Sequence, residues 1–250
     1  MSEPPPIVPP PDPVSAAAPS ARKGAPGWWG AARALAGLGV LLVLTALASG
    51  IVAGIDGGEI DSLAARLSVQ AILALALVGV AYWIAQAQAA ESGETPFECL
   101  GLRRPVRPAI KLSVLAYVAY IACAIVVSSL LDPEQEDITR ELGFDEGTLG
   151  AIAAGILIVV AAPISEEVFF RGLLFSGFRR SGGFIIGAVA SAGIWGLFHY
   201  TGPDSWPVIL QLSIFGVILA WLYDRTGSIW PPIAVHAVNN AIAFSVLASS

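Results

Sequence analysis

Seven stretches of this chain contain no Asp, Glu, Lys or Arg, and each is long enough to cross a lipid bilayer as a helix, which takes about 20 residues. They are 34–55, 67–90, 112–131, 147–165, 181–203, 205–223 and 226–250. A backbone surrounded by hydrocarbon must satisfy its hydrogen bonds internally, which a helix does and a lone strand does not. The sequence therefore predicts an all-α polytopic membrane bundle of about seven transmembrane helices.

Composition agrees with this prediction and excludes one class of partner. Hydrophobic residues make up 56% of the chain and charged residues 13%, whereas about a quarter of a soluble domain is charged. The net charge is −6, and no basic patch with interleaved aromatic residues is present, so we expect no nucleic-acid binding. The lipid bilayer is therefore an expected partner.

The chain divides into a tail and a membrane domain. Residues 1–26 contain nine prolines and almost no large apolar side chain, so 1–27 is expected to be a disordered tail, and 28–250 the transmembrane helical domain. If the tail is cytoplasmic, eleven of the 13 Lys and Arg residues fall at the inner side, all except Arg66 and Arg140. The excess of positive charge predicts that the N-terminus lies in the cytoplasm and the C-terminus outside.

The fourth window continues beyond its charged residues into another apolar run, Gly172 to Phe178. We therefore expect one long helix over 148–180, with a break at Ser181-Gly182-Gly183. Charged side chains at membrane depth cost several kcal/mol, about 2.5 to 3.5 on insertion scales, and are a functional-site hypothesis by default. The polar residues in such windows are Glu166, Glu167, Arg171, His199, His236, Asn239 and Asn240.

The two glutamates have different surroundings on a helix. Glu167 and Arg171 are four residues apart and can pair, while Glu166 points about 100° away. One carboxylate would then be neutralised while the other is free to act as a base. A charge cluster at a helix end is the alternative, but the apolar run after Arg171 argues against it.

His199 is the predicted partner of Glu166. Glu166 lies 16 residues before Gly182 and His199 lies 17 after it, so an antiparallel hairpin would place the two within about 1.5 Å in depth. The alternative is an interfacial histidine near the loop that follows.

His236 and Asn240 share a helix face, four residues apart. Imidazole and amide together can stabilise a developing oxyanion. Hydrogen bonding between helices is the alternative, and Asn239 alone is assigned to it.

These three pieces together resemble the CPBP family of intramembrane proteases, which includes the type II CAAX prenyl endopeptidases and bacteriocin-immunity-associated membrane proteins. The first motif is Glu166-Glu167-Val168-Phe169-Phe170-Arg171-Gly172, the second is an aromatic residue, Trp195, followed by His199, and the third is His236 followed by Asn240. The family usually has Phe where this chain has Trp195, which affects the shape of the pocket more than its chemistry. The resemblance covers roughly residues 95–245, with a catalytic-type core over 148–245.

The resemblance implies hydrolysis of a peptide bond inside the membrane. Glu166 would activate a water with the assistance of His199. His236 and Asn240 would hold the oxyanion. Glu167 and Arg171 would orient Glu166. The implied partner is a membrane-embedded or lipidated peptide or protein substrate, and the implied location is a bacterial-type cell membrane. Prenylated CAAX tails are the implied substrate, although bacterial-type members need not act on them.

The family has been described both as metal-dependent and as metal-free. Glu166, His199 and His236 could form a His₂Glu zinc site. No HExxH is present and no acidic partner for either histidine is evident, so metal-free catalysis without a cofactor is favoured over Zn²⁺.

Two other functions stay open from sequence. A non-catalytic immunity or scaffold protein of the same fold is the main alternative. A secondary transporter with a Glu/His proton relay is disfavoured because the chain shows no inverted repeat.

Overall fold

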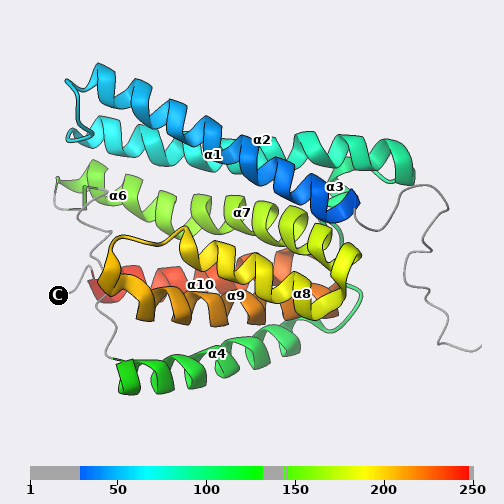
Figure 1. Cartoon of the computed structure of the whole chain (residues 1–250). Coiled ribbons are helices and arrows are strands. Elements are labelled where there is room, and N and C mark those ends of the chain that lie inside the picture. The colour runs from blue at the N-terminus through cyan, green and yellow to red at the C-terminus, as the bar shows by residue number, and fades with distance from the viewer. Residues whose placement is uncertain (1–28, 132–142, 145, 248–250) are drawn as a thin grey trace, which may run out of the picture.

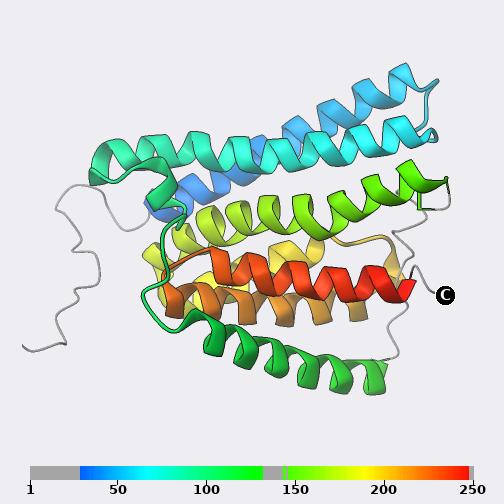
Figure 2. The same ribbon diagram turned by 180° about the vertical axis from the view of Figure 1, so that it is seen from behind.

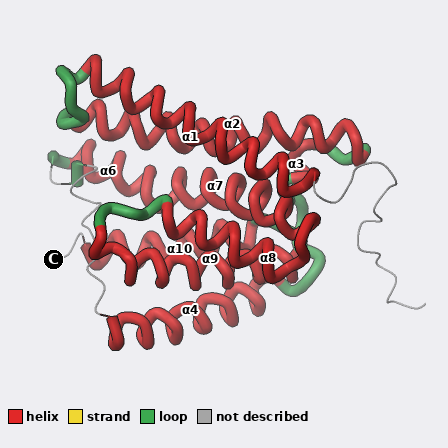
Figure 3. Tube along the Cα trace, in the orientation of Figure 1, coloured by secondary structure: helices red, strands yellow, loops and turns green. Residues whose placement is uncertain are grey.

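The computed structural model describes residues 29–131, 143–144 and 146–247, and the expected tail of 1–27 lies outside them. The described residues form one bundle of roughly antiparallel helices joined by turns (Figures 1 and 2). In chain order the elements are α1 (Trp29–Ile55), α2 (Leu63–Ser92), α3 (Pro96–Cys99), α4 (Ala109–Leu131), α6 (Thr148–Ile156), η1 (Leu157–Ala161), α7 (Ala162–Glu166), η2 (Glu167–Phe175), α8 (Ser176–Leu197), η3 (Pro203–Ser205), α9 (Trp206–Thr226) and α10 (Trp230–Leu247). Within these residues no strand occurs (Figure 3).

Five helical segments in the described part of the chain are long and apolar enough to cross a membrane. One of them, Thr148–Leu197, is 50 residues long and reverses direction at Gly183, which gives it two arms. The 18-residue helix α10 runs beside it. The all-α membrane fold is therefore as predicted, and the arrangement agrees with about seven helices.

The reversal depends on a glycine. Gly183 has φ 81° and ψ −179°, a conformation that is essentially restricted to glycine. The break lies within the predicted Ser181-Gly182-Gly183 turn, so the arm that carries the glutamates and the arm that carries His199 are antiparallel neighbours (Figure 1).

The long arm is not a uniform α-helix, which is a difference from the sequence prediction. Its segments η1 and η2 have the wider i→i+5 turns of a π-helix. Such turns are rare in proteins, and where they occur they are often at functional sites. All nine residues of η2 are buried, and η2 contacts α1, α2, α8 and α9. Glu166 and Glu167 lie at the junction where α7 becomes η2, in the middle of the bundle.

Small residues let α8 and α9 approach closely, as is common in membrane bundles. A Cβ atom at Gly216 would lie 2.8 Å from Cβ of Ala192 and 3.1 Å from the ring of Trp195. The absence of a side chain at Gly216 therefore makes room for the indole of Trp195 between the two helices.

The start of α10 is fixed by the segment between α3 and α4. The N–H of Ile229 donates to the carbonyl of Gly101 at 2.9 Å, and the N–H of Val106 donates to the carbonyl of Thr226 at 2.9 Å. These bonds hold the turn between α9 and α10, and so set the depth at which His236 enters the bundle.

Candidate active site

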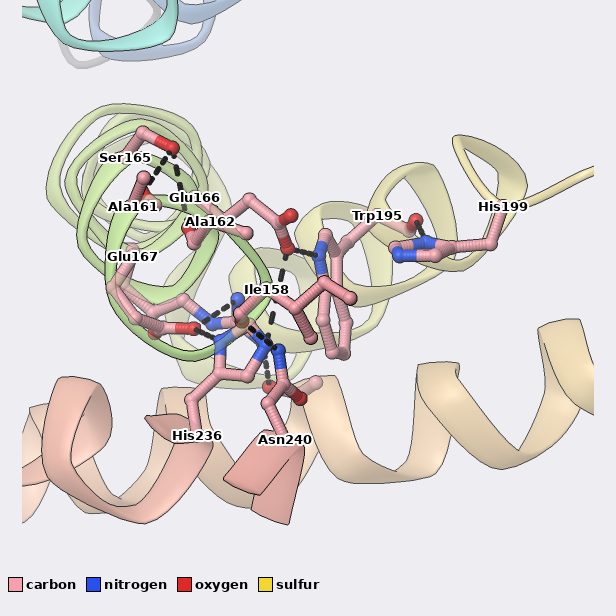
Figure 4. A network of polar contacts seen from close by, with 12 residues as sticks. Ile158, Ala161, Ala162, Ser165, Glu166, Glu167, Trp195, His199, His236 and Asn240 are labelled. Carbon is pink, nitrogen blue, oxygen red and sulfur yellow. Dashed lines mark hydrogen bonds and ion pairs between the residues drawn. The ribbon is translucent and has the colours of Figure 1, made fainter. Parts of the chain in front are cut away.

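The position of Asn240 follows from the backbone of η1. The N–H of Ala162 donates to the carbonyl five residues earlier. In the same register the carbonyl of Ile158 would pair with the nitrogen of Pro163, which carries no hydrogen. The side-chain amide of Asn240 donates to that carbonyl instead, at 2.9 Å (Figure 4). This bond ties α10 to the long arm one turn beyond His236.

Glu167 is the centre of a buried charged cluster. Its side chain is fully buried, and one oxygen, Oε1, accepts a hydrogen bond from Arg171 Nη1 at 2.8 Å and one from His236 Nδ1 at 2.9 Å. Because the carboxylate accepts, Nδ1 of His236 carries a proton. The Nε2 atom of that ring is left facing Glu166.

Glu166 is more open than Glu167. Its Oε2 atom accepts a hydrogen bond of 2.6 Å from Nε1 of Trp195 and lies 4.0 Å from Nε2 of His236. Its side chain keeps 18% of its surface exposed, against 0% for Glu167. A small cavity of about 30 Å³ between α2 and the long arm is lined by Glu166, Ser165 and Gln70, among others. Such a volume is sufficient for one water molecule.

His199 lies on the far side of Trp195 from Glu166 in the close view of the site (Figure 4). Its Nδ1 atom is 2.9 Å from the backbone carbonyl of Trp195. A carbonyl only accepts, so Nδ1 of His199 is the protonated nitrogen and, in the neutral ring, Nε2 is an acceptor.

The contact predicted between Glu166 and His199 is made by a different residue. Trp195, one turn earlier on the same helix, is the residue that donates to Glu166. The count from Gly182 assumed α-helical rise throughout. Because η2 places more residues in each turn, its nine residues advance the chain less, and Glu166 lies level with a residue closer to the hairpin turn.

The contacts of Glu167 and Arg171 also differ from those that the resemblance implied. Both were expected to orient Glu166, but Glu167 binds His236, and Arg171 binds Glu167 and the carbonyl of Gly216. No acidic partner for either histidine was evident from sequence, and Glu167 is such a partner for His236. Helical spacing could not reveal this contact because it joins α10 to the long arm.

The alternative zinc site is not assembled. In the part of the chain that the structure describes, no three His, Cys, Asp or Glu side chains form a group that could hold a metal ion. The Nδ1 contacts of His199 and His236 resemble those of metal-bound histidines, but these two rings and Glu166 do not form one such group.

Trp195 is a residue of the site that was not predicted from the sequence. The sequence signal was present, because Trp195 opens the second motif where the related family usually has Phe. An indole at membrane depth needs an acceptor for its N–H, and Glu166 is that acceptor. With this addition, the site consists of Glu166, Glu167, Arg171, Trp195, His199, His236 and Asn240.

Three known proteins are similar to parts of this chain. The chain is 27% identical over 146 residues to the "Putative membrane peptidase YdiL" of Bacillus subtilis (strain 168), a match that covers 56% of this chain and 58% of that protein. It is 30% identical over 95 residues to the "Uncharacterized protein YyaK" of the same organism, covering 36% of this chain and 31% of that protein. A third relative, the "UPF0177 protein in abiGi 5'region" of Lactococcus lactis subsp. cremoris, is 31% identical over 88 residues, covering 35% of each.

The chain thus spans between about a third and just over half of the length of these relatives. No solved structure matches it. The family model described as type II CAAX prenyl endopeptidase Rce1-like matches residues 148–242, which contain every residue of the site. The chain is therefore an integral membrane protein, and its segment 148–242 is similar to the Rce1-like family of type II CAAX prenyl endopeptidases.

Proposed function

We propose that this protein is an intramembrane endopeptidase that hydrolyses a peptide bond of a membrane-associated substrate, with Glu166 as the general base. The observation that carries the proposal is the contrast between the two adjacent carboxylates. Glu167 is fully buried and bound to Arg171 and His236, whereas Glu166 is partly exposed beside a cavity large enough for water. A general base needs access to the water that it activates, and Glu166 has it.

The proposed reaction transfers one proton twice. Glu166 takes a proton from water while the oxygen of that water bonds to the carbonyl carbon of the substrate. The carbon–oxygen double bond opens to a tetrahedral oxyanion. When the carbon–nitrogen bond breaks, Glu166 returns the proton to the leaving amine, and the products are a carboxylic acid and an amine.

The two histidines have different duties in this proposal. His199 offers Nε2 as an acceptor, because its Nδ1–H is bound to the carbonyl of Trp195, and it assists in orienting the water. His236 acts through its Nε2 side, which faces Glu166. When both ring nitrogens are protonated, Nε2–H donates to the oxyanion.

Asn240 has one amide hydrogen left for the substrate. One N–H of its side chain is bound to the carbonyl of Ile158, and a primary amide has two. The second N–H joins His236 in holding the oxyanion. In this role the bond to Ile158 fixes the direction of the amide.

The substrate class follows from the family description and from the place of the site. A peptide bond must be brought among helices of a membrane bundle, which suits a peptide that carries a lipid or an apolar segment. A prenylated CAAX tail is such a peptide, and we propose it as the first substrate to test.

The test is cleavage of a farnesylated, CAAX-terminated peptide by the purified full-length protein in detergent, with products identified by mass spectrometry in ¹⁸O-labelled water. The expected result is one cleavage, with ¹⁸O in the new carboxylate, that is lost in Glu166→Ala and His199→Ala. An unlipidated peptide of the same sequence shows whether the lipid is needed.

A chelator and metal analysis of the purified protein complete the test. The proposal expects full activity with the chelator and no stoichiometric metal. Cleavage of this peptide that both variants retain would contradict the proposed role of the site, and no cleavage of either peptide would favour the non-catalytic immunity or scaffold function.

A further inference from the structure

Trp195 touches four of the candidate residues. Its indole N–H donates to Glu166 at 2.6 Å, and its backbone carbonyl accepts from His199 at 2.9 Å. The guanidinium of Arg171 lies over the indole, 4.6 Å from its centre, and the ring of His236 meets it edge-on at 5.3 Å. Only 1% of Trp195 is exposed. The one polar atom of its side chain, Nε1, is therefore shielded from water and hydrogen-bonded to Glu166.

We propose that Trp195 is a positioning residue for Glu166. Its N–H holds Oε2 and thereby presents Oε1 to the water; this last step rests on the proposed function. Oε2 is also the oxygen nearest to His236, so both ring systems act on the same side of the carboxylate. Among the described residues no hydrogen-bond donor reaches Oε1, which is therefore the oxygen that can receive a proton.

The indole itself is held in place, so its donor has a fixed direction. The guanidinium of Arg171 lies over the indole ring of Trp195, and the ring of Phe215 packs against the indole with 6.0 Å between ring centres. A side chain at Gly216 would collide with it. Phenylalanine, the usual residue of the related family, would fill much of this space but has no donor. Trp195 thus gives Glu166 a charge-assisted hydrogen bond that phenylalanine at this position could not make.

The hydrogen bond can be tested without any substrate. The protein contains seven tryptophans, so a ¹⁵N-labelled sample gives seven indole N–H signals, and Trp195→Phe identifies the one from Trp195. We expect that signal to lie downfield and to move upfield in Glu166→Ala, while the other six keep their positions. A Trp195 signal that does not respond to Glu166→Ala overturns the proposal. If Trp195→Phe does not fold, Trp195→Tyr gives the same assignment.

The positioning role is tested by kinetics on the farnesylated CAAX peptide. Loss of a hydrogen bond to a charged group predicts a fall in kcat of about 10- to 100-fold with KM changed less than about threefold. Trp221→Phe is the matched control, because Trp221 is a partly buried tryptophan of α9 whose ring lies by Arg225, and it should leave both constants unchanged.

A double variant separates positioning from general packing. If Trp195 acts through Glu166, then Trp195→Phe should have little further effect on the residual rate of Glu166→Gln. An equal loss in that background, a loss confined to KM, or an unchanged kcat overturns the positioning role. Unchanged cleavage in Glu166→Ala would instead refute the proposed function, while the indole signal would still decide whether the hydrogen bond exists.

Discussion

At the scale of single residues, the molecule places a full ion pair where water does not reach. Burying two charges costs several kcal/mol each, and their attraction often does no more than offset that cost. The Glu167–Arg171 pair is therefore poorly explained as a source of stability. Its geometry has another consequence, since the same oxygen of Glu167 binds Nδ1 of His236 and determines which nitrogen of that ring faces Glu166.

Removing the charge of Glu167 should be costly. Glu167→Gln leaves Arg171 buried without its counter-ion, which predicts a loss of about 3 kcal/mol in the free energy of unfolding. The control is Glu91→Gln, since the Glu91 carboxylate pairs with Arg33 but is 51% exposed, and exposed pairs contribute about 0–1 kcal/mol. Denaturant titration in detergent measures both variants. Equal, small losses in the two variants would show that leaving Arg171 without its counter-ion does not have the expected cost.

At the scale of elements, the helices were predictable but their internal register was not. Apolar windows fix where a membrane helix runs because the bilayer requires continuous apolar length, and Gly182-Gly183 marks the reversal. Nothing in the 3.6-residue period indicates that Leu157–Ala161 and Glu167–Phe175 have wider turns. Because of those turns, Glu166 lies beside Trp195 and not, as the α-helical count had predicted, beside His199. The types of the site residues were therefore accessible from sequence, but their partners were not.

The reversal at Gly183 gives a test of the hairpin. Gly183 and Gly193 both have open space around the position of a Cβ atom, but only Gly183 has a positive φ. Gly183→Ala should therefore lower stability by about 1–3 kcal/mol through backbone strain alone. Gly193→Ala, in a helix interior, should be neutral or slightly stabilising. Thermal midpoints in detergent compare the two, and equal midpoints would mean that the reversal does not depend on this backbone conformation.

At the scale of the whole molecule, the sequence predicted the class of fold and the convergence of three motifs from separate helices. The fold class followed from apolar windows of membrane length. The convergence followed from the cost of polar side chains at membrane depth together with the family resemblance. The orientation in the membrane stays a prediction from the distribution of Lys and Arg. In the bundle, the start of α1, the connection from α3 to α4, the hairpin turn and the connection from α9 to α10 lie at one end (Figure 1), and most of the basic residues are in or next to these segments.

Cysteine labelling in intact cells tests this orientation. In a variant without Cys99 and Cys123, two exposed residues can each be changed to cysteine. Arg104 lies in the connection from α3 to α4 and Glu59 in the connection from α1 to α2, and these connections are at opposite ends of the bundle (Figure 1). With that end of the bundle in the cytoplasm, Glu59→Cys should react with a membrane-impermeant thiol reagent in intact cells, and Arg104→Cys only after permeabilisation. The reverse pattern would place the N-terminal end of α1 outside.

The central claim is that Glu166 activates water for peptide hydrolysis, and the most direct measurement is the cleavage rate of Glu166→Gln at saturating farnesylated CAAX peptide. Glutamine keeps the size of the side chain and an acceptor for Trp195 but cannot take a proton from water. General-base catalysis predicts that its kcat falls by about 10²- to 10⁴-fold, with an unchanged thermal midpoint as evidence that the variant is folded. A folded Glu166→Gln variant that cleaves at the rate of the unaltered protein would contradict the account.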